Sequence, residues 1–305
     1  MTYSIVARDP ETGALGVAVQ SHWPFVGFGL AWAEAGVGAV ASQAFSEASY
    51  GPLGLELLRA GKSPSEALAA LTSVDGDADE RQVGIVDVSG RTAIHTGARC
   101  IREAGHLAGD GFTVHANMME RDTVWGAMAE AYEASNAEFP LRLVDALDAA
   151  EAQGGDIRGR QSAAILVVTG SPTGKRWADT VLDARVDDSD LPLPELRRLV
   201  ELQRAYDLMD RGEELSREGD HGAARRSFED ALALAPGAPE IRFWHAVVLA
   251  KTGGAEEARS VMRSLASERP QWAELLHRLP AAGAFPDDPE LLRAVDPEAE
   301  EPHRT

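Results

Sequence analysis

The chain has 305 residues and a formal charge of −20, because 49 acidic side chains outweigh 29 basic ones. Neutralising phosphate groups requires clustered Lys and Arg, so this balance speaks against nucleic acids and anionic lipid surfaces as partners. A hydrophobic share of 44% still allows a sizeable core, and the acidity therefore does not indicate disorder.

No apolar run approaches the roughly 18 residues of a membrane span. The first residues also lack a basic stretch followed by a long apolar one. We therefore expect a soluble, cytoplasmic protein with no membrane partner. The length favours two domains.

The single cysteine, Cys100, excludes an intramolecular disulfide. Its neighbours Arg99 and Arg102 could lower the pKa of the thiol and make it reactive. The alternative is a small residue at the start of a loop or helix.

Two β-like runs at 4–7 and 15–20, joined by a Pro/Gly turn, predict a hairpin at the start of the chain. The elements expected after it are a strand at 37–43, helices at 54–59 and 65–71, a hairpin at 83–88 and 91–95, a strand at 113–116, helices at 124–134 and 141–153, and strands at 163–168 and 181–186. This order is not a βαβ repeat. It favours antiparallel sheets covered by helices.

An acidic, proline-containing stretch at 187–194 suits a linker or a segment packed across a boundary. We place one domain at 1–190 and a helical one at 191–305. A 34-residue unit counted from Ala205 resembles a tetratricopeptide repeat. The bulky, small and proline residues that fit its pattern are Leu208, Gly212, Leu215, Ala224, Phe228, Ala231 and Pro236.

A second unit repeats part of this pattern. Three pairs of residues are each 34 apart: Gly219 and Gly253, Ala224 and Ala258, and Pro236 and Pro270. Arg242 and His245 depart from the pattern in the first helix of the second unit. Because two units are few for a free-standing array, we expect 272–276 and 289–295 to cap it or to pack on the first domain. The acidic residues at 296–302 are expected to form a solvated tail.

Two glycine-rich segments resemble nucleotide-binding loops without meeting their requirements. Segment 170–176 has one residue too few between its glycines, and Arg176 stands where Ser or Thr should bind magnesium. Segment 36–41 matches the letters of a dinucleotide fingerprint but continues into β-favouring residues. We expect a loop and a closely packed strand, and no cofactor.

His95, His106 and His115 lie near the ends of expected strands and could converge. Their spacings of 11 and 9 match no metal-ligand motif, so we expect structural histidines and no metal. Metal-dependent hydrolysis would rest on these residues alone. His22, which follows a strand, is a better candidate for lining a pocket.

Thr2 is the most informative residue. The initiator Met is normally removed before a small residue, which would leave a threonine with a free α-amine at the start of a strand. Its hydroxyl can then attack, while the amine, with a pKa of about 7.7–8.0, accepts the proton. The alternative is that Thr at this position reflects N-terminal processing only.

Many short motifs surround this residue. They include TYSIVARDPETG at 2–13, GVAVQS at 16–21, AEAGVGAVASQ at 33–43, SYGPLG at 49–54, RQVGIVD at 81–87, and shorter segments at 96–97, 104–106, 117–118 and 159–164. Together they resemble the family known as domain of unknown function 1028. That family is grouped with the N-terminal nucleophile (Ntn) hydrolases, which implies a four-layer αββα sandwich and hydrolysis of amide or peptide bonds. The region beyond it is similar to a helical extension that some members carry and that has been labelled peptidoglycan-binding.

The resemblance and the residues both point to Thr2 as the nucleophile of an acyl-enzyme mechanism. Donors for the oxyanion are expected from the strand-end amides of Asn117, Gln20 and Gln43, and from Thr96 with Gly97. The expected substrate-binding or orienting residues are Ser4, Gln20, Gln43, Gly97, His106, Arg160, Gln161 and Ser162, with Arg8 as a further cation for an anionic substrate. A structural role is the alternative for each, since polar residues at strand ends commonly satisfy loop carbonyls.

We therefore expect an amidohydrolase that cleaves a small amide or peptide-like bond. The alternative is a non-catalytic ligand-binding or scaffold protein whose helical repeats bind a partner peptide or a cell-wall fragment. The apolar residues Trp23, Phe25, Phe28 and Trp32 could shield the pocket or form a subunit contact, and we expect a homodimer.

Overall fold

The computed structural model describes residues 2–299, which form two compact units that divide between Val200 and Glu201. The division lies inside helix α6 (Pro192–Glu218). Met1, whose removal the expected mechanism requires, and residues 300–305 of the chain end lie outside the described residues.

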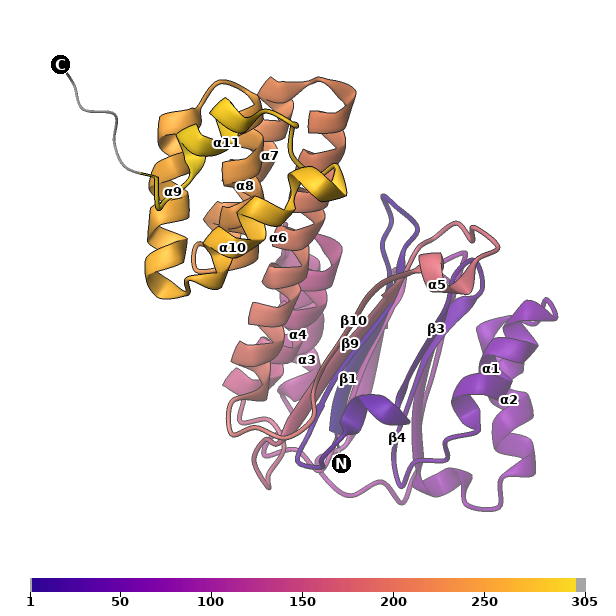
Figure 1. The fold of residues 1–305 in the computed structure, drawn as a ribbon. Coiled ribbons are helices and arrows are strands. Elements are labelled where there is room, and N and C mark those ends of the chain that lie inside the picture. Colours follow the sequence, from indigo (N-terminus) through magenta and orange to yellow (C-terminus); the bar gives the residue numbers. More distant parts are fainter. Residues whose placement is uncertain (1, 300–305) are drawn as a thin grey trace. The chain divides into compact units, whose positions relative to one another are not determined.

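Two antiparallel sheets form the centre of the first unit (Figure 1). The larger has six strands in the order β10-β9-β2-β1-β8-β7, and the smaller has four in the order β3-β4-β5-β6. The strands are β1 (Thr2–Arg8), β2 (Leu15–Ser21), β3 (Ala31–Glu34), β4 (Gly38–Ala44), β5 (Arg81–Asp87), β6 (Thr92–Thr96), β7 (Gly105–Gly109), β8 (Phe112–Asn117), β9 (Ser162–Val168) and β10 (Thr180–Val186).

Two pairs of helices cover the outer faces of the sheets, which confirms the expected four layers (Figure 1). Helices α1 (Tyr50–Arg59) and α2 (Pro64–Val74) pack on the smaller sheet, and α3 (Val124–Ala134) and α4 (Phe139–Ala152) pack on the larger. Ser63 caps α2 with a reciprocal bond to Glu66, as the Ser-Pro sequence indicates. A short helix, α5 (Arg176–Asp179), precedes β10.

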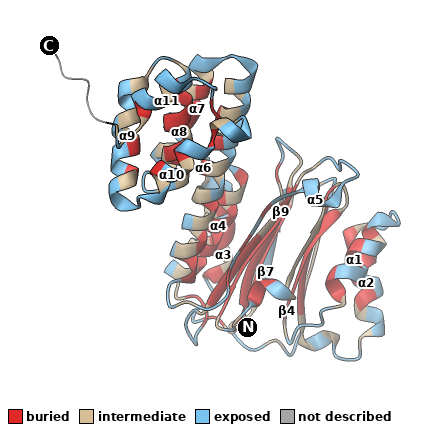
Figure 2. Cartoon of the chain, viewed as in Figure 1, coloured by how far each residue is buried: buried red, intermediate tan, exposed pale blue. Residues whose placement is uncertain are grey.

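Alternation along β1 decides which side chains face the second sheet. Tyr3, Ile5 and Ala7 belong to the core that β1 shares with α3 and α4, whereas Val6 packs between the two sheets. Thr2 shares the face of Val6, because alternate side chains of a strand point the same way. Buried residues accordingly concentrate in the strands and on the inner faces of the helices (Figure 2).

The second unit is all-helical and contains the expected repeat. After α6 come α7 (His221–Leu234), α8 (Pro239–Lys251), α9 (Ala255–Glu268), α10 (Gln271–Arg278) and α11 (Pro289–Val295). A Cβ at Gly212 would lie 2.7 Å from the Phe228 ring, so the small residue lets α6 and α7 approach closely. Leu276 of α10 and Val295 of α11 share a core with α8 and α9, so these last helices cap the repeat.

The strands and helices expected from the sequence are confirmed, and two short strands were not predicted. Both β3 and β7 lie at the edge of a sheet, where a strand needs fewer partners and a weaker apolar pattern suffices. The stretch at 187–194 is not an extended linker. Its Asp187 and Ser189 form backbone hydrogen bonds with Phe25 and Gln161, and α6 begins immediately afterwards. No helix within residues 2–299 is long and apolar enough to cross a membrane.

Gly16→Ala should lower the free energy of unfolding by about 1–3 kcal/mol, because overpacking a tight core displaces its neighbours. A Cβ at this position would lie 2.6 Å from Leu143 Cδ1 and 3.0 Å from the Phe139 ring of α4. Urea unfolding measures the change. Gly29→Ala is the matched control, since a Cβ there meets nothing within 4 Å. An equal loss in both variants would contradict the close approach of α4 and β2.

Candidate functional site

Thr2 lies in a row of polar side chains that crosses the larger sheet. Register pairs Thr2 with Ser21 of β2 and with Asn117 of β8, and pairs Ser21 with Ser162 of β9. Thr2 is only 1% exposed, and its Oγ1 donates a hydrogen bond of 3.1 Å to Ser21 Oγ. The first residue of β1 is therefore fixed within the sheet rather than extending into solvent.

A second polar row faces the first from the smaller sheet. It consists of Gln43 on β4, Gln82 on β5 and Thr96 on β6, which are paired in register. Gln43 Nε2 donates to the Thr2 carbonyl oxygen at 2.9 Å and to Gln82 Oε1 at 2.7 Å. The two rows thus meet at the main chain of Thr2.

Gln82 lies at the centre of this arrangement. Its Oε1 accepts hydrogen bonds from Gln43 Nε2 at 2.7 Å and from Asn117 Nδ2 at 2.9 Å. Its Nε2 donates to Thr96 Oγ1 at 2.9 Å and to the Ala116 carbonyl at 2.9 Å. Asn117 Nδ2 also donates to the Thr2 carbonyl, at 3.3 Å. We call Gln43, Gln82 and Asn117 the amide cluster.

The network continues to a histidine at its margin. Thr96 Oγ1 accepts from Gln82 Nε2 and lies 2.8 Å from His106 Nδ1, a contact in which the tautomer of the imidazole decides which atom donates. Burial, and to a smaller extent His95, lower the pKa of His106 and favour its neutral form. Ser4 Oγ donates to Gln43 Oε1 at 2.5 Å, which fixes the orientation of that amide as well.

The backbone is strained at several residues near the end of the sandwich that carries Thr2. Within residues 2–299, three non-glycine residues have positive φ: Phe25 (58°), Ala44 (72°) and Met118 (59°). Ala44 directly follows Gln43, and Met118 directly follows Asn117. Such conformations cost about 1–3 kcal/mol each and cluster at functional sites.

The structure brings together Thr2, Ser4, Gln43, Asn117 and Thr96, with His106 at the margin. Gln20, which we expected beside them, lies on the opposite face of the sheet, because it shares the face of Ala18 in the core under α4. Both of its amide atoms are buried without a hydrogen-bond partner in the described chain. The expectation for Gln20 is therefore wrong.

Three polar residues expected to hold a substrate, Arg160, Gln161 and Arg8, have other partners. Arg160 forms an ion pair with Glu151 at 3.4 Å, and Gln161 Nε2 donates to Asp188 at 3.0 Å. Arg8 closes the far end of β1 and donates to the Val88 carbonyl at 2.7 Å.

Two other expected residues have structural roles. Ser162 Oγ donates to the Trp23 carbonyl at 2.5 Å and accepts from Val26 N at 3.2 Å, so it shapes the loop after β2. Gly97 donates its N–H to the Arg81 carbonyl at 2.9 Å, and a Cβ there would clash with Asp79. Gly97 therefore permits a tight turn.

The remaining histidines and the cysteine do not form a second centre. His95 Nε2 lies 2.9 Å from the Ala78 carbonyl, and His22 borders the loop after β2 with a buried Nδ1 that has no partner in residues 2–299. No group of three His, Cys, Asp or Glu side chains in the described part of the chain is arranged to hold a metal ion. Burial raises the pKa of the Cys100 thiol, which favours the alternative of a small structural residue at this position.

Exposed apolar side chains surround the Thr2 end of the sandwich. Phe28 is 82% and Trp23 66% exposed. We call the following residues the apolar rim: Trp23, Phe25, Phe28, Phe45, Ile101 and Ile157. Met118, next to Asn117, bonds through its backbone to both Ile101 and Ile157. Trp32, expected in this group, instead packs half-buried against Gly51 of α1.

Gln82 and Ser21 are the residues that sequence reasoning missed. Gln82 directly precedes the strand expected at 83–88, and Ser21 directly follows the strand expected at 15–20. Each is therefore only a polar residue at the end of an expected strand. Neither pattern identifies a partner on the facing sheet.

Comparison with known proteins agrees with this fold. Residues 2–196 match a family described as a family of unknown function, DUF1028, and residues 215–283 match the tetratricopeptide repeat. The chain is also similar to a DUF1028 protein from Silicibacter pomeroyi of known crystal structure. The two share 34% sequence identity over 66% of this chain and 84% of the other, with a TM-score of 0.60. A search of curated proteins gave no match.

Gln82→Leu should lower the free energy of unfolding by about 2–4 kcal/mol, because it leaves two buried amide donors without their acceptor. Chemical denaturation measures the loss. Gln203→Ala is the control, since Gln203 is exposed on α6 and its side chain donates to Asp207 of the same helix. Equal stability of the two variants would show that the amide cluster does not hold the sheets together.

His115, buried between the sheets, predicts a dependence of stability on pH. Burial, with a smaller contribution from His106, lowers the pKa of His115 to about 3, whereas the unfolded chain titrates near 6.5. As the pH falls, His115 therefore binds a proton in the unfolded chain before it does so in the folded chain. The free energy of unfolding consequently decreases as the pH drops from about 6.5 towards 3.

His115→Leu should remove this slope, so that the stability lost between about pH 7 and pH 5 shrinks by about 2 kcal/mol. Urea unfolding at the two pH values provides the measurement, with the exposed His221→Leu as control. An unchanged slope in His115→Leu would contradict a neutral buried imidazole.

Proposed function

This chain belongs to the DUF1028 family of unknown function, and we propose that it is an N-terminal-nucleophile amidohydrolase with Thr2 as its nucleophile. The observation that carries the proposal is the fixed position of Thr2. Its carbonyl accepts hydrogen bonds from Gln43 and Asn117, which come from different sheets, and its hydroxyl is bonded to Ser21. A reacting group held from several directions is the arrangement that positioned catalysis requires.

In the proposed reaction, removal of Met1 frees the α-amine of Thr2. The amine takes the hydroxyl proton as Thr2 Oγ1 attacks the amide carbonyl, and it returns this proton to the leaving amine. An ester between the acyl group and Thr2 remains, and water hydrolyses it. The acyl group leaves as a carboxylic acid, and no other reactant is needed.

Asn117 offers the amine a partner. Its Oδ1 is buried and has no hydrogen-bond partner within residues 2–299, while Asn117 pairs with Thr2 in register. A buried acceptor without a partner is costly, and a protonated amine on Thr2 would satisfy it. The amine carries the proton both when Thr2 attacks the amide and when water hydrolyses the ester. Asn117 Oδ1 would therefore stabilise the protonated amine in both steps.

The role we propose for Gln43 and Asn117 differs from an oxyanion hole. Each has two N–H groups, and each already donates to the Thr2 carbonyl and to Gln82 Oε1. They therefore position the nucleophile, as does Ser4 through Gln43.

The apolar rim favours substrates with an apolar group next to the amide. Monomeric proteins seldom expose several large apolar side chains together without a binding role. Arg8 bonds the Val88 carbonyl at the far end of β1, and Arg160 reaches Glu151 of α4 rather than the amide cluster. The groups around Thr2 are therefore apolar or neutral, and they support an apolar acyl group better than a bound carboxylate.

Thr2→Ala should abolish hydrolysis of N-acyl amides, and Thr2→Ser should retain a measurable part of it, because only serine keeps a hydroxyl beside the amine. Release of free amine from acetyl, octanoyl and phenylacetyl amides measures turnover. The intact mass of each protein should show the loss of Met1. Ser73→Ala is the control, since Ser73 is exposed on α2 and its hydroxyl bonds the Ala70 carbonyl of the same helix. Unchanged turnover in Thr2→Ala, or retention of Met1 by an active enzyme, would overturn the proposal.

A further inference from the structure

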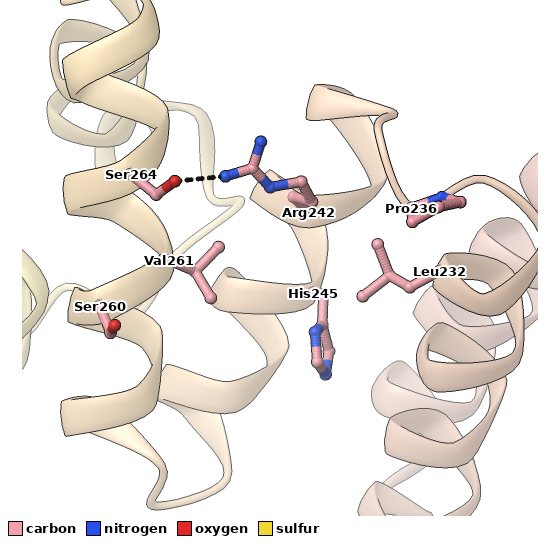
Figure 3. Close-up of a pocket in the computed structure, with 7 residues that line it drawn as sticks. All are labelled: Leu232, Pro236, Arg242, His245, Ser260, Val261 and Ser264. Carbon is pink, nitrogen blue, oxygen red and sulfur yellow. Dashed lines mark hydrogen bonds between the residues drawn. The ribbon is translucent and has the colours of Figure 1, made fainter.

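A hollow of about 370 Å³ opens in the second unit, far along the chain from Thr2. Its volume lies in the usual range of small-molecule sites, about 300–1,000 Å³. Figure 3 shows α8 at its centre, with α7 on one side and α9 on the other. The lining residues are Leu232, Pro236, Arg242, His245, Ser260, Val261 and Ser264.

One residue that lines the hollow departs from the repeat. Arg242 stands 34 residues after Leu208, and Leu208 packs against the core of the first repeat unit. In the second unit the corresponding side chain is Arg242, which is 20% exposed and turned towards α9. The departure places a cationic group at the hollow where the first unit has an apolar one.

The walls combine an apolar surface with one cationic donor. Leu232, Pro236 and Val261 supply the apolar part. Arg242 forms an ion pair with Glu268, to which it donates at 2.8 Å, and it donates to Ser264 Oγ at 2.7 Å. These contacts use two of its five N–H groups. The other N–H groups have no partner among the described residues and can donate to the carboxylate of a ligand.

His245 keeps the floor of the hollow uncharged. It stacks on Phe228 with ring centroids 5.6 Å apart, and burial lowers its pKa. The imidazole therefore adds aromatic surface rather than a second charge at neutral pH.

We propose that this hollow binds a small organic acid with an aliphatic body, its chain against Leu232, Pro236 and Val261 and its carboxylate on Arg242. An alcohol of the same length would fill the space without the charge-assisted bond. The inference concerns binding in the second unit alone and does not depend on the chemistry of Thr2.

Titration of the full-length chain with octanoate by isothermal calorimetry tests the site. We expect saturable 1:1 binding, at least tenfold weaker binding of octanol, and a loss of tenfold or more in Arg242→Gln. Arg242→Leu restores the residue found at 208 and should also abolish binding while raising the unfolding temperature. Arg225→Gln, which removes an exposed arginine paired with Glu229 and Glu257, should bind octanoate normally.

Three results would overturn the inference: no saturation with octanoate up to millimolar concentration, equal binding of octanol, or undiminished binding in Arg242→Gln. Thr2→Ala should bind octanoate as the wild type does. Weaker binding in Thr2→Ala would place the acid at the Thr2 end instead.

Discussion

The two hydrogen bonds that Gln82 Oε1 accepts hold the Thr2 end of the sandwich together. One comes from Gln43 on its own sheet and the other from Asn117 on the facing sheet. Each of these amides then donates its remaining N–H to the Thr2 carbonyl. Because all three side chains are fully buried, none can exchange its partner for water, and the position of Thr2 depends on the whole set.

The strained residues at 44 and 118 fit the same constraint. Ala44, which still pairs with Arg81, is the last residue of β4, and Met118 directly follows the last residue of β8. Their left-handed conformations therefore coincide with the ends of the two strands that carry Gln43 and Asn117. The cost of this backbone is offset by the buried network that it completes.

Sequence patterns predicted the strands and helices of this unit well, because apolar runs, turns and helix caps are local properties, whereas the four-layer arrangement was implied by the family resemblance. The sequence predicted the site only in part. Gln20 and Gln43 each follow a run of apolar residues and look alike in the sequence, yet they lie on opposite faces of their sheets. Register decides this, since a shift of one residue reverses every side chain, and register depends on strands distant in the chain. Gln82 was missed for the same reason.

In the helical unit, a 34-residue spacing was sufficient to predict the repeat and to mark Arg242 as a departure from it. The hollow beside Arg242 depends on what α7 and α9 leave unfilled, which no single residue reveals. Departures from a repeat are therefore useful places to look for sites, although the neighbouring helices determine whether one exists.

The most direct test of the central claim is the mass of the protein after reaction with an activated acyl ester. If Thr2 is the nucleophile, the wild-type chain gains an acyl group that hydroxylamine removes, and peptide mapping places this ester on an N-terminal peptide that begins with Thr2. Acyl groups on amines form amides, which hydroxylamine leaves in place, so Thr2→Ala should gain no hydroxylamine-labile group. A labile acyl group on any other residue, or equal labile labelling of Thr2→Ala, would contradict the account.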